Sequence, residues 1–103
     1  MNKILLLITS EPDKKIALNV GRLLIKKKLA ACISLKEIIS IYNWKGEIEQ
    51  VKEFQIIVKS TPSHLNKIID LLKKQLKNEL PQIIYNIFDS DINYFNWVDK
   101  NVK

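Results

Sequence analysis

Apolar and polar positions change their spacing several times along the chain. Residues 4–8 (ILLLI) form an unbroken apolar run of strand length, which is typical of a central strand buried on both faces. Ser10 and Pro12 then suit the start of a helix, with Ser10 as its cap. The expected helix ends near Lys28, and its apolar face comprises Ile16, Ala17, Val20, Leu23 and Leu24.

Two long strands follow, at residues 31–42 and 47–60, and a turn at residues 43–46 joins them. Alternation of apolar and polar residues is the main signal for both strands. In the second of them, one face is formed by Phe54, Ile56 and Val58. These segments predict a long β-hairpin.

The first long strand contains an irregularity at residues 36–37. Before it, the alternating apolar residues are Ile33 and Leu35. After it, the apolar residues Ile39 and Ile41 indicate a changed phase. We interpret the change as a β-bulge, because one extra residue exchanges the two faces of a strand.

The remaining third of the chain predicts a helix, a strand and a second helix. Thr61 suits the cap of the first helix and Pro62 its first turn. Its apolar face comprises Leu65, Ile68, Ile69, Leu72 and Leu76. A strand is expected at residues 83–88, and Ser90 caps a short last helix. The apolar side of that helix comprises Tyr94, Trp97 and Val98.

The order of these elements is β-α-β-β-α-β followed by a C-terminal helix. It predicts an α+β fold of the ferredoxin-like split β-α-β type, with a long hairpin between the second and third strands. We expect an antiparallel sheet that carries both main helices on one face. Residues 1–103 are expected to form a single domain.

The predicted hairpin is longer than the body of the domain. A compact domain of this size is about 33 Å across, whereas a strand of about 13 residues spans about 43 Å. The overhang carries Tyr42 and Trp44 outward, with Gly46 in the turn. Because burying one Trp is worth about 5 kcal/mol before entropy costs, we expect a homo-oligomer in which a neighbour receives the hairpin. The alternative is a shorter hairpin whose Trp44 folds back on its own sheet.

Composition adds a basic charge balance and one cysteine. The chain carries 17 Lys and Arg against 11 Asp and Glu, a formal charge of +6 that permits weak attraction to anionic partners. Residues 52–56 lack the glycine and paired aromatics of an RNA-recognition strand, so nucleic acid is not an expected partner. Cys32 has no second cysteine to pair with, and no run approaches the ~20 apolar residues of a membrane span. We expect a cytoplasmic protein with no membrane partner.

Five segments are distinctive in combination: LAACIS (29–34), IYNWKGEIEQ (41–50), IIVKSTPSHL (56–65), ELPQII (79–84) and YFNWV (94–98). In this order, and over essentially the whole chain, they resemble the CutA family of divalent-cation tolerance proteins. The resemblance implies a ferredoxin-like subunit in a tight homotrimer held by strand pairing, with a role in tolerance to copper and other divalent metals. Some members resemble trimeric signalling proteins of the PII type. A small-ligand-binding or regulatory trimer that uses intersubunit clefts is therefore the alternative function.

Three positions depart from the family pattern. The histidine proposed as a copper ligand falls at Leu76, a histidine that sometimes precedes it falls at Gln75, and a cysteine of some members falls at Thr9. We therefore expect no direct copper site at these positions. No residue is assigned as a metal ligand and no cofactor is expected beyond a divalent cation such as copper.

The other reactive side chains form no motif. We interpret Cys32 as a core residue and His64 as an exposed residue of a first helical turn, whereas a transition-metal site needs two to four converging ligands. No G-x-S-x-G elbow occurs and no nucleophile lies beside the histidine, so we expect no enzyme. Acidic residues that suit either hard-cation contacts or a solvated surface are Glu47, Glu49, Glu53, Asp89 and Asp91.

A cleft between subunits is the candidate ligand site. The residues expected to line it are Glu53, Lys59, Tyr85 and Trp97. Lys59, near the end of a central strand, would meet a small anion there. The alternative is that the ammonium group of Lys59 simply reaches solvent.

Overall fold

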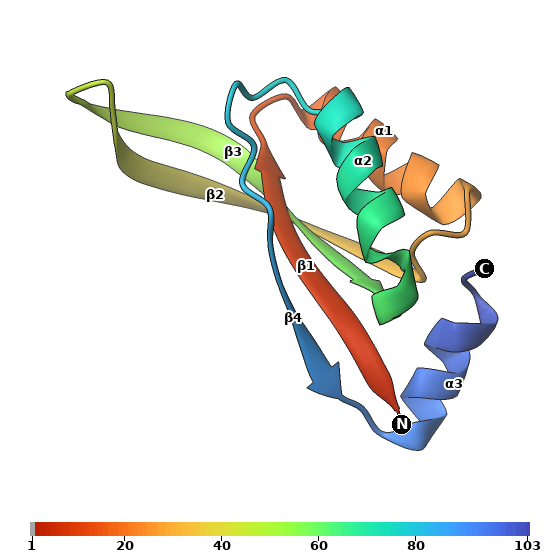
Figure 1. Ribbon diagram of the computed structural model, residues 1–103. Coiled ribbons are helices and arrows are strands. Elements are labelled where there is room, and N and C mark those ends of the chain that lie inside the picture. The colour runs from red at the N-terminus through yellow and green to blue at the C-terminus, as the bar shows by residue number, and fades with distance from the viewer. Residues whose placement is uncertain (1) are drawn as a thin grey trace.

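The computed structural model describes residues 2–103. Its elements follow one another as β1 (Lys3–Glu11), α1 (Lys14–Lys26), β2 (Cys32–Trp44), β3 (Glu47–Ser60), α2 (Leu65–Gln75), β4 (Ile84–Asp89) and α3 (Ile92–Lys100), as Figure 1 shows. A 3₁₀ turn, η1 (Pro62–His64), leads into α2. The order confirms the predicted α+β fold with its additional C-terminal helix.

The strands make one antiparallel sheet in the order β2-β3-β1-β4. Helices α1 and α2 lie side by side against one face of it (Figure 1). We call this face the helix-covered face and the opposite one the open face. Because successive residues of a strand point to opposite faces, Leu5 and Leu7 of β1 point to the helix-covered face and Leu6 and Ile8 to the open face.

The core lies between the helices and the central strands. It is almost entirely aliphatic, as expected for side chains that lose the most contact with water on folding. Its fully buried members are Leu5, Leu7, Ala17, Val20, Leu24, Ala30, Ile56, Val58, Ile68 and Leu72. The predicted face of β3 is confirmed for Ile56 and Val58, which are fully buried. Phe54, the third residue of that face, is only partly buried.

The outer half of the hairpin projects beyond the body of the molecule (Figure 1). Strand β1 pairs with β3 only from Phe54 to Ser60, so residues 38–53 of the hairpin have no partner from β1. We call residues 38–53 the arm. With the arm included, the molecule measures 45 × 24 × 22 Å and is therefore elongated.

The predicted bulge at residues 36–37 is wrong. The pairing of β2 with β3 runs without interruption from Cys32 opposite Lys59 to Trp44 opposite Glu47. All the apolar residues that suggested a phase change have odd numbers and share one face: Ile33, Leu35, Ile39 and Ile41. A polar residue, Glu37, interrupts the apolar alternation there without shifting it.

Two helix caps lie further along the chain than predicted. Asp13, not Ser10, caps α1, because its carboxylate accepts hydrogen bonds of 2.8 and 3.3 Å from first-turn N–H groups. Strand β1 continues through Ser10 to Glu11, which leaves no room for a cap there. Similarly, Asp91 rather than Ser90 caps α3. In both cases an aspartate performs the role predicted for a serine.

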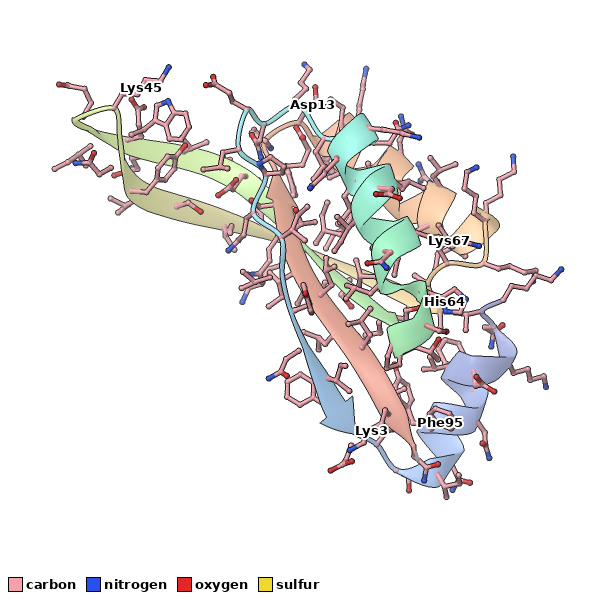
Figure 2. All side chains as sticks on the ribbon, in the orientation of Figure 1. Lys3, Asp13, Lys45, His64, Lys67 and Phe95 are labelled. Atoms are coloured by element: carbon pink, nitrogen blue, oxygen red, sulfur yellow. The ribbon has the colours of Figure 1, made fainter. Side chains whose placement is uncertain are left out.

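His64 is buried, with 6% of its surface exposed, and the prediction of an exposed residue is wrong. Its Nε2 contacts the backbone oxygen of Lys103, 39 residues away. That oxygen can only accept, so Nε2 donates to it, and Nδ1 is hydrogen-bonded to the hydroxyl of Thr61 at 2.7 Å. Thr61 therefore holds the imidazole instead of capping a helix. His64 connects the start of α2 to the segment after α3 (Figure 2).

A second tie joins the ends of two neighbouring strands. The ammonium group of Lys3, the first residue of β1, donates a hydrogen bond to the carboxylate of Asp89, the last residue of β4. This hydrogen bond, with the charge of Lys3, holds the pKa of the Asp89 carboxyl below its ordinary value.

Candidate functional site

The arm and a loop of the body border an open cavity of about 850 Å³ on the open face. The loop, residues 78–82, joins α2 to β4 and crosses toward the arm. This volume is within the range of ligand pockets, roughly 300–1,000 Å³. The side chains that form its wall include Tyr42, Trp44, Glu49, Glu53, Glu79 and Leu80.

The tip of the arm is a two-residue hairpin turn. Trp44 pairs with Glu47, and the residues between them, Lys45 and Gly46, both have positive φ (52° and 83°). Such turns match the right-handed twist of the strands and favour glycine. The side-chain oxygen of Asn43 accepts from the N–H of Gly46 at 3.2 Å and closes the turn. The predicted turn at residues 43–46 is therefore confirmed at its centre.

Trp44 is half-buried rather than fully exposed. The ammonium group of Lys45 lies 5.7 Å from the centre of the indole ring, and it also lies 3.9 Å from the carboxylate of Glu79 in the loop. Figure 2 shows Lys45 at the end of the arm. The indole thus faces the cavity, and the arm itself does not fold back on the sheet.

The opposite surface of the arm is the apolar one that meets solvent. Ile39 and Ile41 of β2 are 65% and 66% exposed, and Ile48 of β3 is 81% exposed. A monomer gains nothing from three exposed isoleucines on a strand pair whose outer edge is also unpaired. The arm therefore has the composition of a contact surface.

The charge of the cavity is negative. Glu49 and Glu53 come from the arm and Glu79 from the loop, and no cationic side chain lines it among the described residues. Carboxylate groups favour a ligand that carries positive charge. The cavity is consequently a poor place for the small anion that the sequence suggested.

Lys59 lies elsewhere on the open face, six residues along β3 from Glu53. Its ammonium group is 3.2 Å from the hydroxyl of Ser34 and 3.8 Å from the sulfur of Cys32. Cys32 is half-buried on this face and so is not the core residue that was predicted. The strand alternation that placed Cys32 was sound, but the face it points to is not covered by a helix.

The other two predicted cleft residues are not brought to Lys59 within one chain. Tyr85 pairs with Leu7 and so points to the helix-covered face, opposite to that of Lys59. Trp97 lies on α3, where it stacks on Tyr94 with ring centres 5.9 Å apart. A cleft formed by Glu53, Lys59, Tyr85 and Trp97 together therefore requires a second copy of the chain.

The three positions that depart from the family pattern do not fit a copper site here. Thr9 and Leu76 are buried on the core side, and Gln75 is exposed at the end of α2. His64, the sole imidazole, has hydrogen-bond partners on both nitrogens. Across residues 2–103, no three His, Cys, Asp or Glu side chains gather closely enough to hold one metal ion.

Glu11 is a buried carboxylate that sequence reasoning missed. It is fully buried, and its two oxygens accept from the N–H of Asp13 and of Lys77, each at 3.0 Å. It thereby joins the β1–α1 corner to the residues after α2. No spacing signal identifies it, because a glutamate beside Pro12 is equally common in an exposed first turn.

Comparisons with known proteins agree with this geometry. Residues 5–101 match the family described as CutA1 divalent ion tolerance protein. The divalent-cation tolerance protein CutA of Salmonella newport is 31% identical over 98 residues, which cover 93% of this chain and 85% of the relative. Across residues 2–103, no helix has the length and apolar character needed to cross a membrane.

Solved structures superpose over nearly the whole chain. CutA from Xylella fastidiosa has a TM-score of 0.92 at 27% identity and covers 97% of this chain and 98% of its own. CutA1 from Pyrococcus horikoshii has a TM-score of 0.92 at 28% identity, with 96% and 98% covered. A periplasmic divalent cation tolerance protein CutA from Archaeoglobus fulgidus has a TM-score of 0.92 at 28% identity, with 97% and 99% covered. Because the family match and the superposed structures agree over nearly the whole chain, the chain belongs to the CutA1 divalent ion tolerance family.

Proposed function

We propose that this protein acts in tolerance to divalent metal ions as a non-catalytic homotrimer. One observation carries the assembly: the sheet ends in two unpaired strands, β2 and β4, at opposite edges. An unpaired strand edge invites pairing with another chain. The exposed isoleucines of the arm add apolar area to the same contact.

Contact between the β2 edge of one copy and the β4 edge of the next is head-to-tail, and such contacts form a closed ring when the rotation between copies closes. The resemblance to the family supports three as the number of copies. The open face supports a closed assembly as well, because Ile84 and Phe88 of β4 are about half exposed on it. A neighbouring copy of the chain could cover these exposed apolar side chains with apolar side chains of its own.

Native mass spectrometry of the purified protein tests the assembly. We expect a species of three times the 12.0 kDa chain mass. The same spectrum reports any metal ion or small molecule that remains bound. A monomer at micromolar chain concentration would contradict the proposal.

We propose that the metal-related role does not use a soft-ligand copper site within one subunit. Two observations support this. Both ring nitrogens of His64 already have hydrogen-bond partners, and Thr9 and Leu76 are buried in the core. Copper titration followed by isothermal calorimetry tests it, with Cys32→Ala as the matched variant. Submicromolar binding of one copper ion per chain that disappears in Cys32→Ala would overturn this part of the proposal.

A second candidate function is a regulatory trimer that binds a small ligand in the cavity beside the arm. The observation that favours it is the 850 Å³ cavity with Trp44, Glu49 and Glu53 in its wall. The acidic lining favours a ligand with an amine or another cationic group. Calorimetric titration of the wild type and Glu53→Gln with small amines and with nucleotides separates the two charge classes of ligand.

We place the protein in the cytoplasm, which its unpaired Cys32 supports. The relative from Archaeoglobus fulgidus is described as periplasmic. Cell fractionation of an epitope-tagged chain, with periplasmic and cytoplasmic marker proteins, distinguishes the two compartments.

A further inference from the structure

Charged side chains are unevenly divided between the helices and the rest of the chain. Residues 12–31 and 61–77, which contain α1, α2 and the turns next to them, carry 10 Lys and Arg against 2 Asp. All other residues together carry 7 Lys and Arg against 9 Asp and Glu. The excess of positive charge therefore lies on the two helices that cover the sheet.

Most of these cations are exposed on the outer side of the helices. Arg22 and Lys26 lie beside β2, at an edge assigned to a neighbouring copy, and are set aside. Seven other lysines of the two segments are exposed and form no ion pair within residues 2–103. We call them the basic surface, which consists of Lys14, Lys15, Lys27, Lys28, Lys67, Lys73 and Lys74.

The basic surface lies outside the contacts proposed between copies. Those contacts are the edges of β2 and β4, the open face and the arm, and none of the seven lysines belongs to them. Figure 2 shows Lys67 on the side of α2 away from the sheet. A closed ring held by its strands therefore leaves this surface in contact with solvent.

The basic surface has two ends, because α1 and α2 run in opposite directions along the sheet (Figure 1). The ion pair of Asp13 with Lys77, at 3.9 Å, shows that the start of α1 lies beside the end of α2. The lysines at this first end are Lys14, Lys15, Lys73 and Lys74.

The second end joins the turn after α1 to the start of α2. Lys103 connects them, since its N–H donates to the backbone oxygen of Lys28 at 2.9 Å and its own oxygen contacts His64. The lysines at this end are Lys27, Lys28 and Lys67. Helix α1 has 13 residues, so the two groups of cations are about 20 Å apart.

Helix stability explains only part of the basic surface. Lysines at the C-terminal end of a helix are favourable, because they face the negative end of the helix dipole. Lys14 and Lys15 instead occupy the first turn of α1, and Lys67 the first turn of α2, where the dipole is positive. Neither first turn contains an acidic residue. These three lysines oppose helix stability and so indicate a role in binding.

The chemistry of the surface favours a phosphate backbone over other anionic partners. The two segments contain no Phe, Tyr or Trp, so they offer no stacking platform for unpaired bases and no aromatic anchor for a protein. Lysine ammonium groups bind phosphates as point charges without a fixed orientation. A membrane is flat, whereas the helices of the copies in a closed ring face different directions.

Duplex DNA also has matching dimensions. Its major groove is about 12 Å wide and is bordered by two rows of phosphates. Two groups of cations about 20 Å apart can reach the phosphates on both sides of one groove. We propose that the basic surface binds the backbone of double-stranded DNA without reading its sequence. The expectation against nucleic acid concerned base recognition by the strands, and backbone contact needs cations alone.

Fluorescence anisotropy of a fluorescein-labelled two-turn DNA duplex, titrated with the full chain at several salt concentrations, tests the proposal. We expect saturable binding with a Kd of about 100 µM or below at physiological salt. The logarithm of the association constant should fall linearly with the logarithm of the salt concentration, with a slope of about −3 or steeper. Duplexes of two unrelated sequences should bind equally. Absence of binding at about 50 mM salt, or a strong preference for one sequence, overturns the proposal.

Lys15→Glu combined with Lys67→Glu separates binding from stability. Both substitutions place a carboxylate in a first helical turn, where it is favourable, so the melting temperature should rise. Binding of the duplex should nevertheless weaken at least about tenfold, because two attractive contacts with phosphate become repulsive. A lower melting temperature overturns the proposal, since a structural role would then explain these lysines.

Lys36→Glu combined with Lys52→Glu is the matched control, because it makes the same change in net charge at exposed positions of β2 and β3. The control variant should bind the duplex like the wild type. Equal losses in the two variants overturn the proposal, because they indicate attraction to net charge alone.

Three further probes test the choice of partner: vesicles of anionic phospholipid, polyglutamate and single-stranded DNA of the same length. We expect each of them to bind more weakly than the duplex. Tighter binding of any one of them overturns the proposal.

Discussion

The hydroxyl of Thr9 is a polar group in the wrong surroundings. Thr9 is fully buried, and its Oγ1 has no hydrogen-bond partner among the described residues. A buried hydroxyl without a partner costs about 1–3 kcal/mol because the bonds it makes to water in the unfolded chain are lost. The hydroxyl of Thr9 therefore lowers the free energy of unfolding, although the side chain is well packed.

Thr9→Val should therefore raise the free energy of unfolding by about 1 kcal/mol, because valine keeps the shape and removes the hydroxyl. Urea unfolding at fixed chain concentration measures it. Thr9→Ala is the contrast, since it also removes a methyl group and leaves a cavity, and it should be less stable than Thr9→Val. Equal destabilisation by the two substitutions would mean that the hydroxyl has a partner that the structure does not contain.

Glu11 connects three elements through one side chain. Its oxygens accept from N–H groups on each side, so the carboxylate holds β1, the start of α1 and the end of α2 together. Hydrogen bonds to a charged acceptor are worth about 1.5–3 kcal/mol each when the alternative is a buried N–H without a partner. The corner depends on the charge as well as on the shape.

Glu11→Gln should lower the free energy of unfolding by about 2 kcal/mol, because the amide nitrogen replaces an acceptor next to an N–H donor. Asp70→Asn on the exposed side of α2 removes the same charge and is the control, with an expected change within about 0.5 kcal/mol. Urea unfolding of both variants gives the comparison. Equal stability of Glu11→Gln and the wild type would show that the two hydrogen bonds add nothing.

At the scale of elements, the sequence predicts type and order well and boundaries less well. Apolar residues recur every three or four positions in α2 and every second position in β3, and these periods identify the two elements. Such a period can be read from a short stretch of sequence, because it results from the burial of one face of a single element. The caps at Asp13 and Asp91 were each assigned to a nearby serine, because Ser and Asp suit a cap equally.

The candidate site was less predictable than the fold. Trp44 and Gly46 identify the turn from local sequence. Glu53 lines the cavity beside the arm, whereas Lys59, Tyr85 and Trp97, which were predicted to share a cleft with it, do not. The loop residue Glu79 was not predicted to face the arm, because that contact is set by the path of the chain between α2 and β4. For the same reason His64 could not be predicted as buried, since its partner at Lys103 is distant in sequence.

At the scale of the whole molecule, the arm is the element whose stability depends on a partner. It has only its own two strands, and an isolated two-stranded hairpin is marginal in water. Trp44 is partly buried in the free chain, so a neighbour has at most about a third of its area left to cover. At ~25 cal/mol per Å², covering this area is worth less than about 2 kcal/mol per subunit.

Trp44→Ala should therefore weaken assembly more than it changes the body of the subunit. We expect dissociation at higher chain concentration than in the wild type, measured by light scattering over a dilution series. Lys45→Ala is the control, because it changes the tip of the arm without removing apolar area. An unchanged dilution curve and melting temperature for Trp44→Ala would remove the role assigned to this indole.

The uninterrupted register of β2 and β3 restricts how the length of the arm can change. One residue inserted into either strand would move every side chain beyond it to the other face, exchanging the indole with the isoleucines. Two residues added to each strand preserve both faces and lengthen the arm by about 6.6 Å. The length of the arm can therefore change only by an even number of residues in each strand if its two faces are to be preserved.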